Sequence, residues 1–324
     1  MNGDGVAASV IIPTWNGAHH LAVCLDSLGR QSFGSFETIV VDNGSTDGTR
    51  DLLAAYPSVR PLWLPRNIGF AGAVNAGIQA ARSDVLVLLN NDTEVEPDWL
   101  GALVAALDGA PGAGMATSKV RLFDARDTLH TTGDTVNRAG QAANRGVWEV
   151  DEGQYDDARW VFGASGAAAA YRRGMLDDVG PFCADFGSYF EDVDLAWRAR
   201  LRGWRCVFAP GAVVYHKLSA TGGGPLASYL VARNRAWTIL RCYPSPLAWR
   251  SAGRILAAEL AITGRALHHV RGAAARATLR GQLAGWLGAW RMLGPRRAIQ
   301  RRRLIGLDAM DGLLRGREPA GPAA

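Results

Sequence analysis

Residues 85–92, Val-Leu-Val-Leu-Leu-Asn-Asn-Asp, indicate both a class of fold and the place of a site. The five apolar residues predict a short buried strand, which ends abruptly in two amides and the carboxylate of Asp92. Ligands of open α/β sheets bind beyond the carboxyl ends of strands, where a carboxylate suits a divalent cation and such a cation suits a diphosphate. The same polar residues are good turn and helix-cap residues, so this segment alone leaves both interpretations open.

The segments before this strand alternate strand and helix signals. Apolar runs predict strands, and periodic patterns predict helices, over the following ranges: strands 10–12, 38–41 and 62–64, helices 19–31, 45–56 and 72–82. Ser45 or Thr46 is expected to cap the second of these helices. The alternation favours an α/β fold with a mostly parallel central sheet and helices on both faces.

The middle of the chain is less regular. Residues 121–160 are polar and glycine-rich, which predicts a long excursion over the face that holds the site. Val193, Trp197, Leu201 and Trp204 form a helical stripe that is expected to stop around Gly203. The run 211–215 is strand-like and ends at His216.

Composition limits the class of protein. The chain has 324 residues, of which 48% are hydrophobic and 20% charged, as in an ordinary globular protein. The four cysteines are scattered without a C-x-x-C pair, which is typical of reduced thiols in a cytosolic protein. The acidic N-terminus with its short apolar run is unlike a secretory signal, and no window approaches the roughly 20 apolar residues of a membrane span. We therefore expect a cytoplasmic protein.

Charge divides the chain in two. Residues 1–224 carry 18 basic and 26 acidic residues, whereas residues 225–324 carry 17 arginines and 4 acidic residues. This asymmetry predicts a domain of residues 1–224, a boundary near Gly222-Gly223-Gly224-Pro225, and a basic helical region of residues 225–324. Such a region suits an anionic partner.

Three polar clusters are expected at one edge of the sheet. Pro13-Thr14-Trp15-Asn16 ends the first strand, Asp42-Asn43-Gly44-Ser45 ends the second, and Asn90-Asn91-Asp92 ends the fourth. A carboxylate such as Asp42 can accept the imide N–H of uracil or thymine. Each cluster alone is also ordinary loop chemistry, but three on one edge favour a nucleotide site.

Arg66-Asn67-Ile68-Gly69-Phe70, followed by Asn75 and Gly77, is a fourth element. Glycines allow close backbone approach to a ligand, and the helix that starts after Gly69 favours a phosphate. No G-x-x-x-x-G-K-[ST] and no G-x-G-x-x-G after a strand is present, which disfavours a P-loop or a dinucleotide-binding fold.

Two further groups suggest chemistry. Glu191-Asp192-Val193-Asp194 places three carboxylates at the start of a helix, where the macrodipole should keep Asp192 ionised and able to serve as a general base. The simpler interpretation is helix-start chemistry, with Asp194 and Arg198 as an i,i+4 ion pair. His216 is either a structural histidine or a metal ligand.

Together these segments, in this order, closely resemble the inverting glycosyltransferases of family 2, and most of all the bacterial rhamnosyltransferase-like branch of cell-wall and O-antigen assembly. The resemblance spans residues 8–243 and includes Tyr229 and Arg233-Asn234-Arg235. It implies the Rossmann-like GT-A fold, a UDP- or dTDP-sugar donor and Mg²⁺ or Mn²⁺. The last eighty residues have no match.

The resemblance also assigns roles. Asp192 would be the general base, and Asp92 and His216 the metal ligands. Asn90 departs from the Asp-x-Asp form of the motif, so it would hydrogen-bond the ribose in place of supplying a second carboxylate ligand. Gly163, Ala164, Ser165 and Glu191 would line the sugar and acceptor pocket. The donor would contact Pro13, Thr14, Asn16, Asp42, Asn43, Asn67, Gly69, Asn75, Asn90 and Asn91.

The acceptor implied is a hydroxyl of a glycan or of a polyprenyl-linked glycan in cell-wall or surface-polysaccharide assembly. The arginine-rich tail with interspersed tryptophans suits an interfacial helix on anionic lipid, hence a peripheral position on the inner face of the cell membrane. A solvated appendage and a homo-oligomer contact are the alternatives, and no motif indicates nucleic acid.

Two other functions remain open at this point. A sugar-nucleotide pyrophosphorylase shares the fold layout, but its glycine-rich arginine signature does not follow the first strand. A noncatalytic sugar-nucleotide-binding protein would keep the donor site without turnover.

Overall fold

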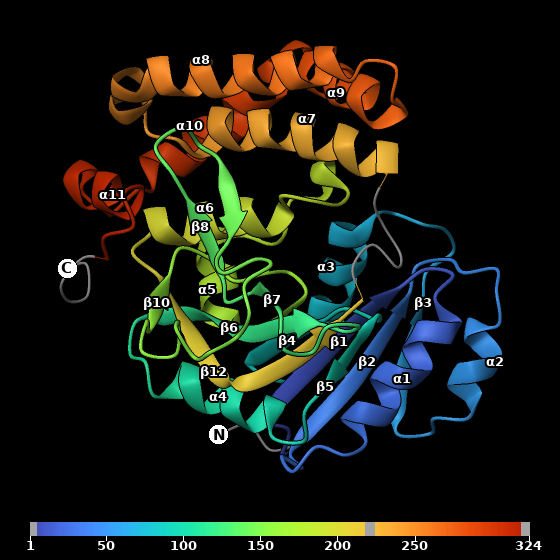
Figure 1. The fold of residues 1–324 in the computed structure, drawn as a ribbon. Helices are drawn as coiled ribbons and strands as arrows, with labels where there is room; N and C mark the ends of the chain where they lie inside the picture. Colours follow the sequence, from blue (N-terminus) through green and yellow to red (C-terminus); the bar gives the residue numbers. More distant parts are fainter. Residues whose placement is uncertain (1–4, 218–223, 319–324) are drawn as a thin grey trace.

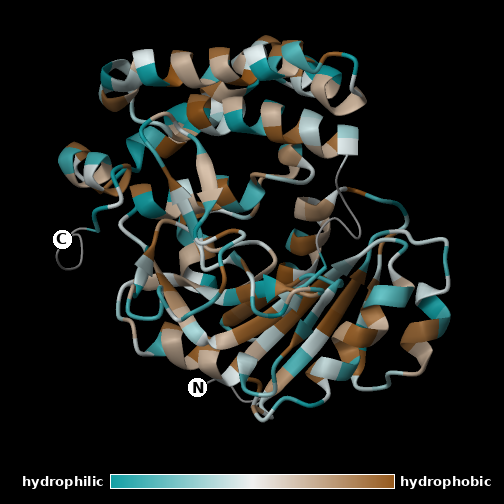
Figure 2. Ribbon diagram, viewed as in Figure 1, coloured by the Kyte–Doolittle hydropathy of each residue, from teal (hydrophilic) through white to brown (hydrophobic). Residues whose placement is uncertain are grey.

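The computed structural model of the chain describes residues 5–217 and 224–318. A ten-stranded sheet lies at its centre, with helices against both faces, and a layer of C-terminal helices lies across one side (Figure 1). The strands are the most continuously apolar elements, because they are covered on both sides (Figure 2).

The first half of the chain forms a parallel unit, as the alternating pattern predicts. Its elements are β1 (Ala8–Thr14), α1 (Ala18–Leu28), β2 (Phe36–Asp42), α2 (Thr49–Ala54), β3 (Val59–Trp63), α3 (Phe70–Ala80) and β4 (Val85–Leu89). The strand order is β4-β1-β2-β3, with Thr14 beside Asp42 and Asp42 beside Trp63. One expectation is wrong: α2 begins at Thr49 after Gly48, so neither Ser45 nor Thr46 caps it.

The second half extends the sheet in the order β10-β12-β6-β11-β4. Its elements are β5 (Thr93–Val95), α4 (Trp99–Asp108), β6 (Ala113–Leu122), β10 (Trp160–Val161), β11 (Ala168–Arg172), α5 (Arg173–Val179), α6 (Glu191–Leu201) and β12 (Arg205–His216). β5 pairs antiparallel with the end of β12, so His216 lies opposite Thr93. This pairing brings the end of β12 to the segment that follows β4.

The irregular middle crosses the site face. β7 (Leu129–Thr131) pairs with β6, and β8 (Asp134–Val136) forms a hairpin with β9 (Ala142–Asn144). Asp134 also bridges to Gly163 in antiparallel fashion. The segment therefore connects the sheet edge with the region of α6.

The basic region is helical, as predicted. It comprises α7 (Gly224–Cys242), α8 (Ser245–His268), α9 (Ala273–Leu287), α10 (Leu293–Arg301) and α11 (Leu307–Leu313). Cys242, Tyr243 and Leu247 join the same hydrophobic cluster as Trp197 of α6, so this helical layer shares a core with the rest of the chain. Of the expected boundary, Gly222 and Gly223 lie outside the described residues, whereas Gly224 and Pro225 begin α7. Within the described ranges, no helix combines the length and hydropathy that a membrane span requires.

Candidate active site

The loops after β1, β2 and β4 are tied together at one edge of the sheet. The backbone N–H of Asn43 donates to the carbonyl of Thr14 at 2.8 Å, and the Asn91 amide donates to the Thr14 hydroxyl at 2.8 Å. These residues are buried, so the bonds fix the loops in place. The structure thus brings Pro13, at the end of β1, and Thr14 to the edge where Asn91 lies.

A second set of bonds shapes the expected base pocket. The Ser45 N–H donates to Asp42 Oδ1 at 3.1 Å, and Asp42 is buried. Asn16 has a left-handed backbone with φ of 50°, accepts the Thr46 N–H and donates its own N–H to the Ser45 hydroxyl. Ser45 and Thr46 therefore organise this loop instead of capping α2.

Asn43 and Asn67 join the loop after β2 to the loop after β3. The Asn43 amide donates to Asn67 Oδ1 at 3.0 Å, and Asn43 Oδ1 accepts the Ile68 N–H at 2.9 Å. Gly69 has φ of 81°, and a Cβ there would lie 3.0 Å from Gly187 Cα. Only glycine allows this approach, which sets the loop against the segment before α6.

Asn75 has a structural role. Its amide donates to the Phe182 carbonyl at 2.8 Å and its Oδ1 accepts the Phe182 N–H at 3.0 Å. These bonds attach α3 to the segment after α5. A contact between Asn75 and a donor stays a prediction.

Asp92 and His216, the two expected metal ligands, meet at the edge of the sheet. Asp92 Oδ1 and His216 Nε2 lie 3.1 Å apart, and both side chains are largely buried. The pairing of β5 with β12 brings the two residues together, because Asp92 immediately precedes β5 and His216 ends β12. Asn90 points its amide at the same imidazole, 3.5 Å from Nε2.

The residues present fit a divalent cation. A carboxylate and an imidazole lie side by side, and the buried Asn90 Oδ1 has no hydrogen-bond partner in the described structure. No group of three or more His, Cys, Asp or Glu side chains is arranged for a metal in residues 5–217 and 224–318. Two protein ligands suit an ion whose remaining positions are filled by a diphosphate and water.

His130, which sequence reasoning missed, supports His216. The two rings stack with centroids 5.1 Å apart, and their Nδ1 atoms lie 3.1 Å apart. Burial, followed by the neighbouring His216, lowers the pKa of His130 to about 4, so the ring is neutral. The Asn144 amide lies 3.3 Å from His130 Nε2. This support holds the His216 ring with Nε2 toward Asp92.

Asp192 lies in the first turn of α6. Its carboxylate accepts the N–H of Gly166 at 2.9 Å and its own helix's Val193 N–H at 2.8 Å. The sequence predicts that the helix start keeps this group ionised. Burial instead raises the pKa of Asp192, although the two N–H donors oppose that shift. A carboxylate with a raised pKa is a stronger base.

One short loop connects Asp192 with the segment after β4. Gly166 binds Asp192, and the carbonyl of the next residue, Ala167, accepts the Asn90 N–H at 2.9 Å. In the same loop a Cβ at Gly163 would lie 2.5 Å from Ala196 Cβ, and Ala164 and Ser165 are buried. The loop therefore sets the spacing between the expected base and the expected metal ligands.

Two more acids surround Asp192. Glu191 is buried with Oε2 unpaired in the described structure, and burial together with the charges of Asp192 and Asp134 raises its pKa well above the usual range. Burial and Asp192 likewise raise the pKa of Asp134, in β8. Both acids are therefore harder to ionise than ordinary exposed carboxyls. No local sequence pattern indicates a role for Asp134 beyond its place in the irregular segment 121–160.

The turn before α6 is strained. Tyr189 and Phe190 have φ of 66° and 67°, unusual for residues with large side chains. The buried amide of Asn234 in α7 lies within 2.7–3.0 Å of the carbonyls of Phe186, Ser188 and Tyr189. The helical layer thus holds the turn that places Asp192.

Asp194 is structural, as the simpler interpretation proposed. Its Oδ2 accepts the Arg198 Nε at 2.8 Å, and Arg241 of α7 lies 3.1 Å from Oδ1. These buried ion pairs attach α6 to α7.

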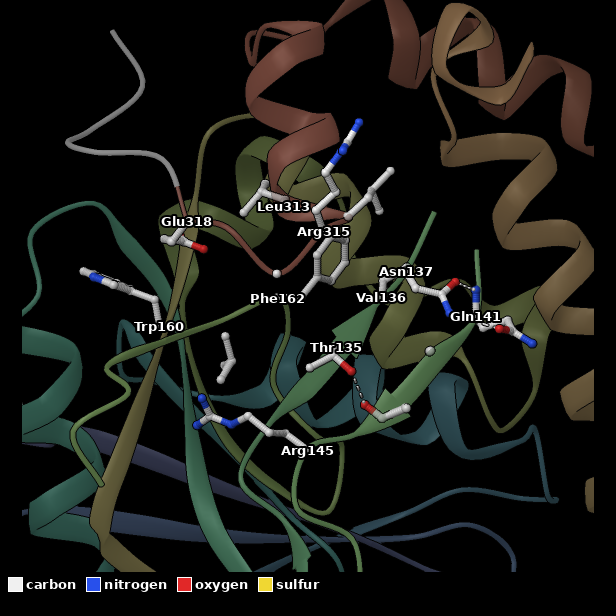
Figure 3. Close-up of a pocket in the computed structure, with 15 residues that line it drawn as sticks. Thr135, Val136, Asn137, Gln141, Arg145, Trp160, Phe162, Leu313, Arg315 and Glu318 are labelled. Atoms are coloured by element: carbon white, nitrogen blue, oxygen red, sulfur yellow. Dashed lines mark hydrogen bonds between the residues drawn. The ribbon is translucent and has the colours of Figure 1, made fainter. Parts of the chain in front are cut away.

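A cavity of about 700 Å³ lies beside this region, between the β8–β9 hairpin and the C-terminal segment around α11 (Figure 3). Phe162, Arg145 and Arg315 are among its walls. None of its described lining residues is an expected donor, metal or base residue. The cavity is therefore separate from the cluster that carries the chemistry.

Solved structures share this fold. A Staphylococcus aureus TarS fragment, residues 1–349 with UDP, is 22% identical and aligns over 79% of this chain and 71% of its own with a TM-score of 0.54. The mannosyltransferase PcManGT of Pyrobaculum calidifontis, with GDP-Man and Mn²⁺, is 20% identical over 93% and 84%, with a TM-score of 0.54. The fold is that of GT-A glycosyltransferases.

Residues 9–180 match the family model for glycosyl transferase family 2, and the chain belongs to that family. It is a glycosyltransferase. An N-acetylglucosaminyl-diphospho-decaprenol L-rhamnosyltransferase of Mycobacterium tuberculosis is 29% identical over 76% of this chain and 89% of its own length. An uncharacterized protein of Sinorhizobium fredii is 31% identical over 66% of this chain, but this match spans only 25% of its length.

Proposed function

We propose that the chain transfers a sugar, with inversion, from a UDP- or dTDP-sugar to a hydroxyl of a lipid-linked glycan in cell-wall or surface-polysaccharide assembly. The observation that carries the proposal is the continuous set of bonds from the sheet edge to α6: Asn90 binds Ala167, and Gly166 binds Asp192. These bonds link the segment that carries the expected metal ligands to the helix that carries the expected base, which supports a single site.

The donor is expected to bind along the carboxyl edge of β1, β2 and β4. Asp42 would accept the imide N–H of uracil or thymine, and Asp92 and His216 would hold Mn²⁺ or Mg²⁺. The imidazole ligand favours Mn²⁺, because Mg²⁺ prefers oxygen ligands. When bound, the cation supplies positive charge that stabilises the departing diphosphate.

Asp192 is expected to act on the acceptor. Its carboxylate accepts the hydroxyl proton while the hydroxyl oxygen forms a bond to the anomeric carbon and the bond to the diphosphate breaks on the opposite face. One displacement inverts the anomeric centre. Burial raises the pKa of Glu191, and in its protonated form this carboxyl would donate a hydrogen bond to a sugar oxygen.

The acceptor class rests on the relative. The mycobacterial protein named above is a rhamnosyltransferase that acts on a lipid-linked diphosphate sugar, and it aligns along 76% of this chain. A polyprenyl-diphosphate-linked sugar is accordingly the first acceptor to test, with L-rhamnose as the first sugar.

The test begins with calorimetry of UDP- and dTDP-sugars in the presence of Mn²⁺, followed by transfer to a polyprenyl-diphosphate-linked acceptor. We expect metal-dependent binding of one donor class and a product in which the configuration of the anomeric carbon is inverted. Tight donor binding without turnover on any acceptor would favour a noncatalytic binding protein. Formation of a nucleotide sugar from a nucleoside triphosphate and a sugar phosphate would indicate a pyrophosphorylase.

A further inference from the structure

Helix α8 has two apolar faces. Leu247, Ala258 and Ala266 are buried against the rest of the helical layer. Trp249, Leu256, Leu260 and Leu267 follow a spacing of seven, four and seven residues, which places them together on another side of the helix. We call these four residues the outer stripe.

The outer stripe is exposed. Its side chains are 81%, 59%, 61% and 56% accessible in chain order. Further along the chain, Trp286 and Leu287 at the end of α9 and Trp290 just after it are also 49%, 69% and 71% exposed. Large apolar side chains gathered in this way do not contribute to the core, and such patches mark interaction surfaces.

The charge around the stripe has one sign. Residues 245–303 contain twelve arginines and a single acidic residue, Glu259. Glu259 is buried and paired with Arg235 of α7, so it does not offset the exposed charge. Arg250, Arg254 and Arg265 are exposed on α8 itself.

We propose that the outer stripe and its arginines dock the protein on an anionic lipid bilayer, with Trp249 and the leucines at the level of the headgroups. A second copy of the chain is a poorer occupant, because a symmetric contact would bring arginines against arginines. An anionic bilayer complements both the charge and the apolar side chains. The inference deepens the proposed function, since it brings the enzyme to the surface that holds a lipid-linked acceptor.

The docking places the layer between lipid and catalytic machinery. α6, whose first turn carries Asp192, lies between the layer and the sheet (Figure 1), and Asn234 of α7 binds the turn before it. A bilayer at α8 is thus on the side of the molecule from which α7 supports the base.

The test is sedimentation of the full chain with vesicles of phosphatidylcholine alone and of phosphatidylcholine mixed with phosphatidylglycerol. The wild type is expected to pellet only with the anionic vesicles, and less so as salt increases. Replacing Trp249, Leu256, Leu260 and Leu267 with Gln should reduce the partition coefficient about tenfold or more, because apolar contact with the interface is lost. Replacing Arg250 with Gln should reduce it about fivefold.

The matched control is Trp148→Gln with Val150→Gln, which removes exposed apolar side chains from the irregular segment 121–160 and should leave vesicle binding unchanged. Wild-type protein that stays in the supernatant, or a Gln-stripe variant that pellets like the wild type, would overturn the proposal. So would light scattering that shows a dimer abolished by the stripe variant without any vesicle binding. Calorimetric donor binding, measured separately, shows whether the catalytic proposal fails instead.

Discussion

The carboxyl edge of the sheet and the helical layer use their polar residues differently. At the edge, Thr14, Asp42 and Asp92 are buried and held by neighbouring loops. In the layer, the inner surface is equally engaged, with Asn234 and Arg241 bound to the turn before α6 and to α6 itself. The outer surface instead exposes arginines and the outer stripe.

The two regions position functional residues in different ways. The residues of the edge lie together because parallel strands end at the same edge of the sheet. The helical layer acts on the site differently, since α7 packs against the strained turn before α6 and binds it through Asn234. The edge is therefore expected to govern donor and metal binding. The inner layer is expected to govern turnover.

The largest expected effect is that of Asp192→Asn, which should separate turnover from donor binding. Loss of the base should lower kcat about 10³-fold while donor and Mn²⁺ binding at the edge persist. In the wild type, kcat should fall as pH decreases through the raised pKa of Asp192, because the protonated carboxyl cannot accept a proton. Steady-state kinetics from pH 5 to 8 measure both, with the exposed Asp177→Asn as the control.

A second variant tests whether the helical layer affects turnover through the turn that positions Asp192. Asn234→Ala removes the donor to the carbonyls of the turn, which should lower kcat about tenfold or more and cost about 1–3 kcal/mol of stability. The donor KM should change little. Asn234→Asp, which keeps the shape but cannot donate, should be at least as damaging. An unaltered kcat in both variants would show that the helical layer has no role in turnover.

A third variant tests the support of the metal ligand. His130→Phe keeps the ring stacked on His216 but removes the Nδ1 contact, which should weaken Mn²⁺ binding about tenfold. Calorimetric titration with Mn²⁺ and a nucleoside diphosphate measures the change. The exposed His268→Phe should bind as the wild type does. Equal affinity in all three proteins would deny His130 this role.

The smallest expected effect concerns stability. The pKa of Asp134 is raised by burial and by Asp192, so its contribution is favourable only at low pH and is lost as pH rises. Asp134→Asn should therefore increase the free energy of unfolding at neutral pH by about 1–3 kcal/mol, and the gain should vanish near pH 4. Urea unfolding at the two pH values tests the sign. A gain that grows toward low pH would contradict it.

Much of the fold followed from the chain alone. Short apolar runs that end in polar residues predict parallel strands. Parallel strands bring Thr14, Asp42 and Asp92 to one edge of the sheet, and this does not depend on the conformation of the loops. His130 and Asn234 carry no such signal. Their roles depend on a strand pairing across the excursion and on the packing of α7 against the turn before α6, which local patterns do not specify.

Asp92 and His216 are expected to hold a cation for the donor diphosphate, while Asp192 acts on the acceptor elsewhere in the same site. Electron paramagnetic resonance of Mn²⁺, titrated into the protein with UDP or dTDP, tests it most directly. A signal of bound Mn²⁺ is expected for the wild type and for Asp192→Asn, and it should be lost in Asp92→Asn and His216→Ala. Equal Mn²⁺ binding by all four proteins would contradict it.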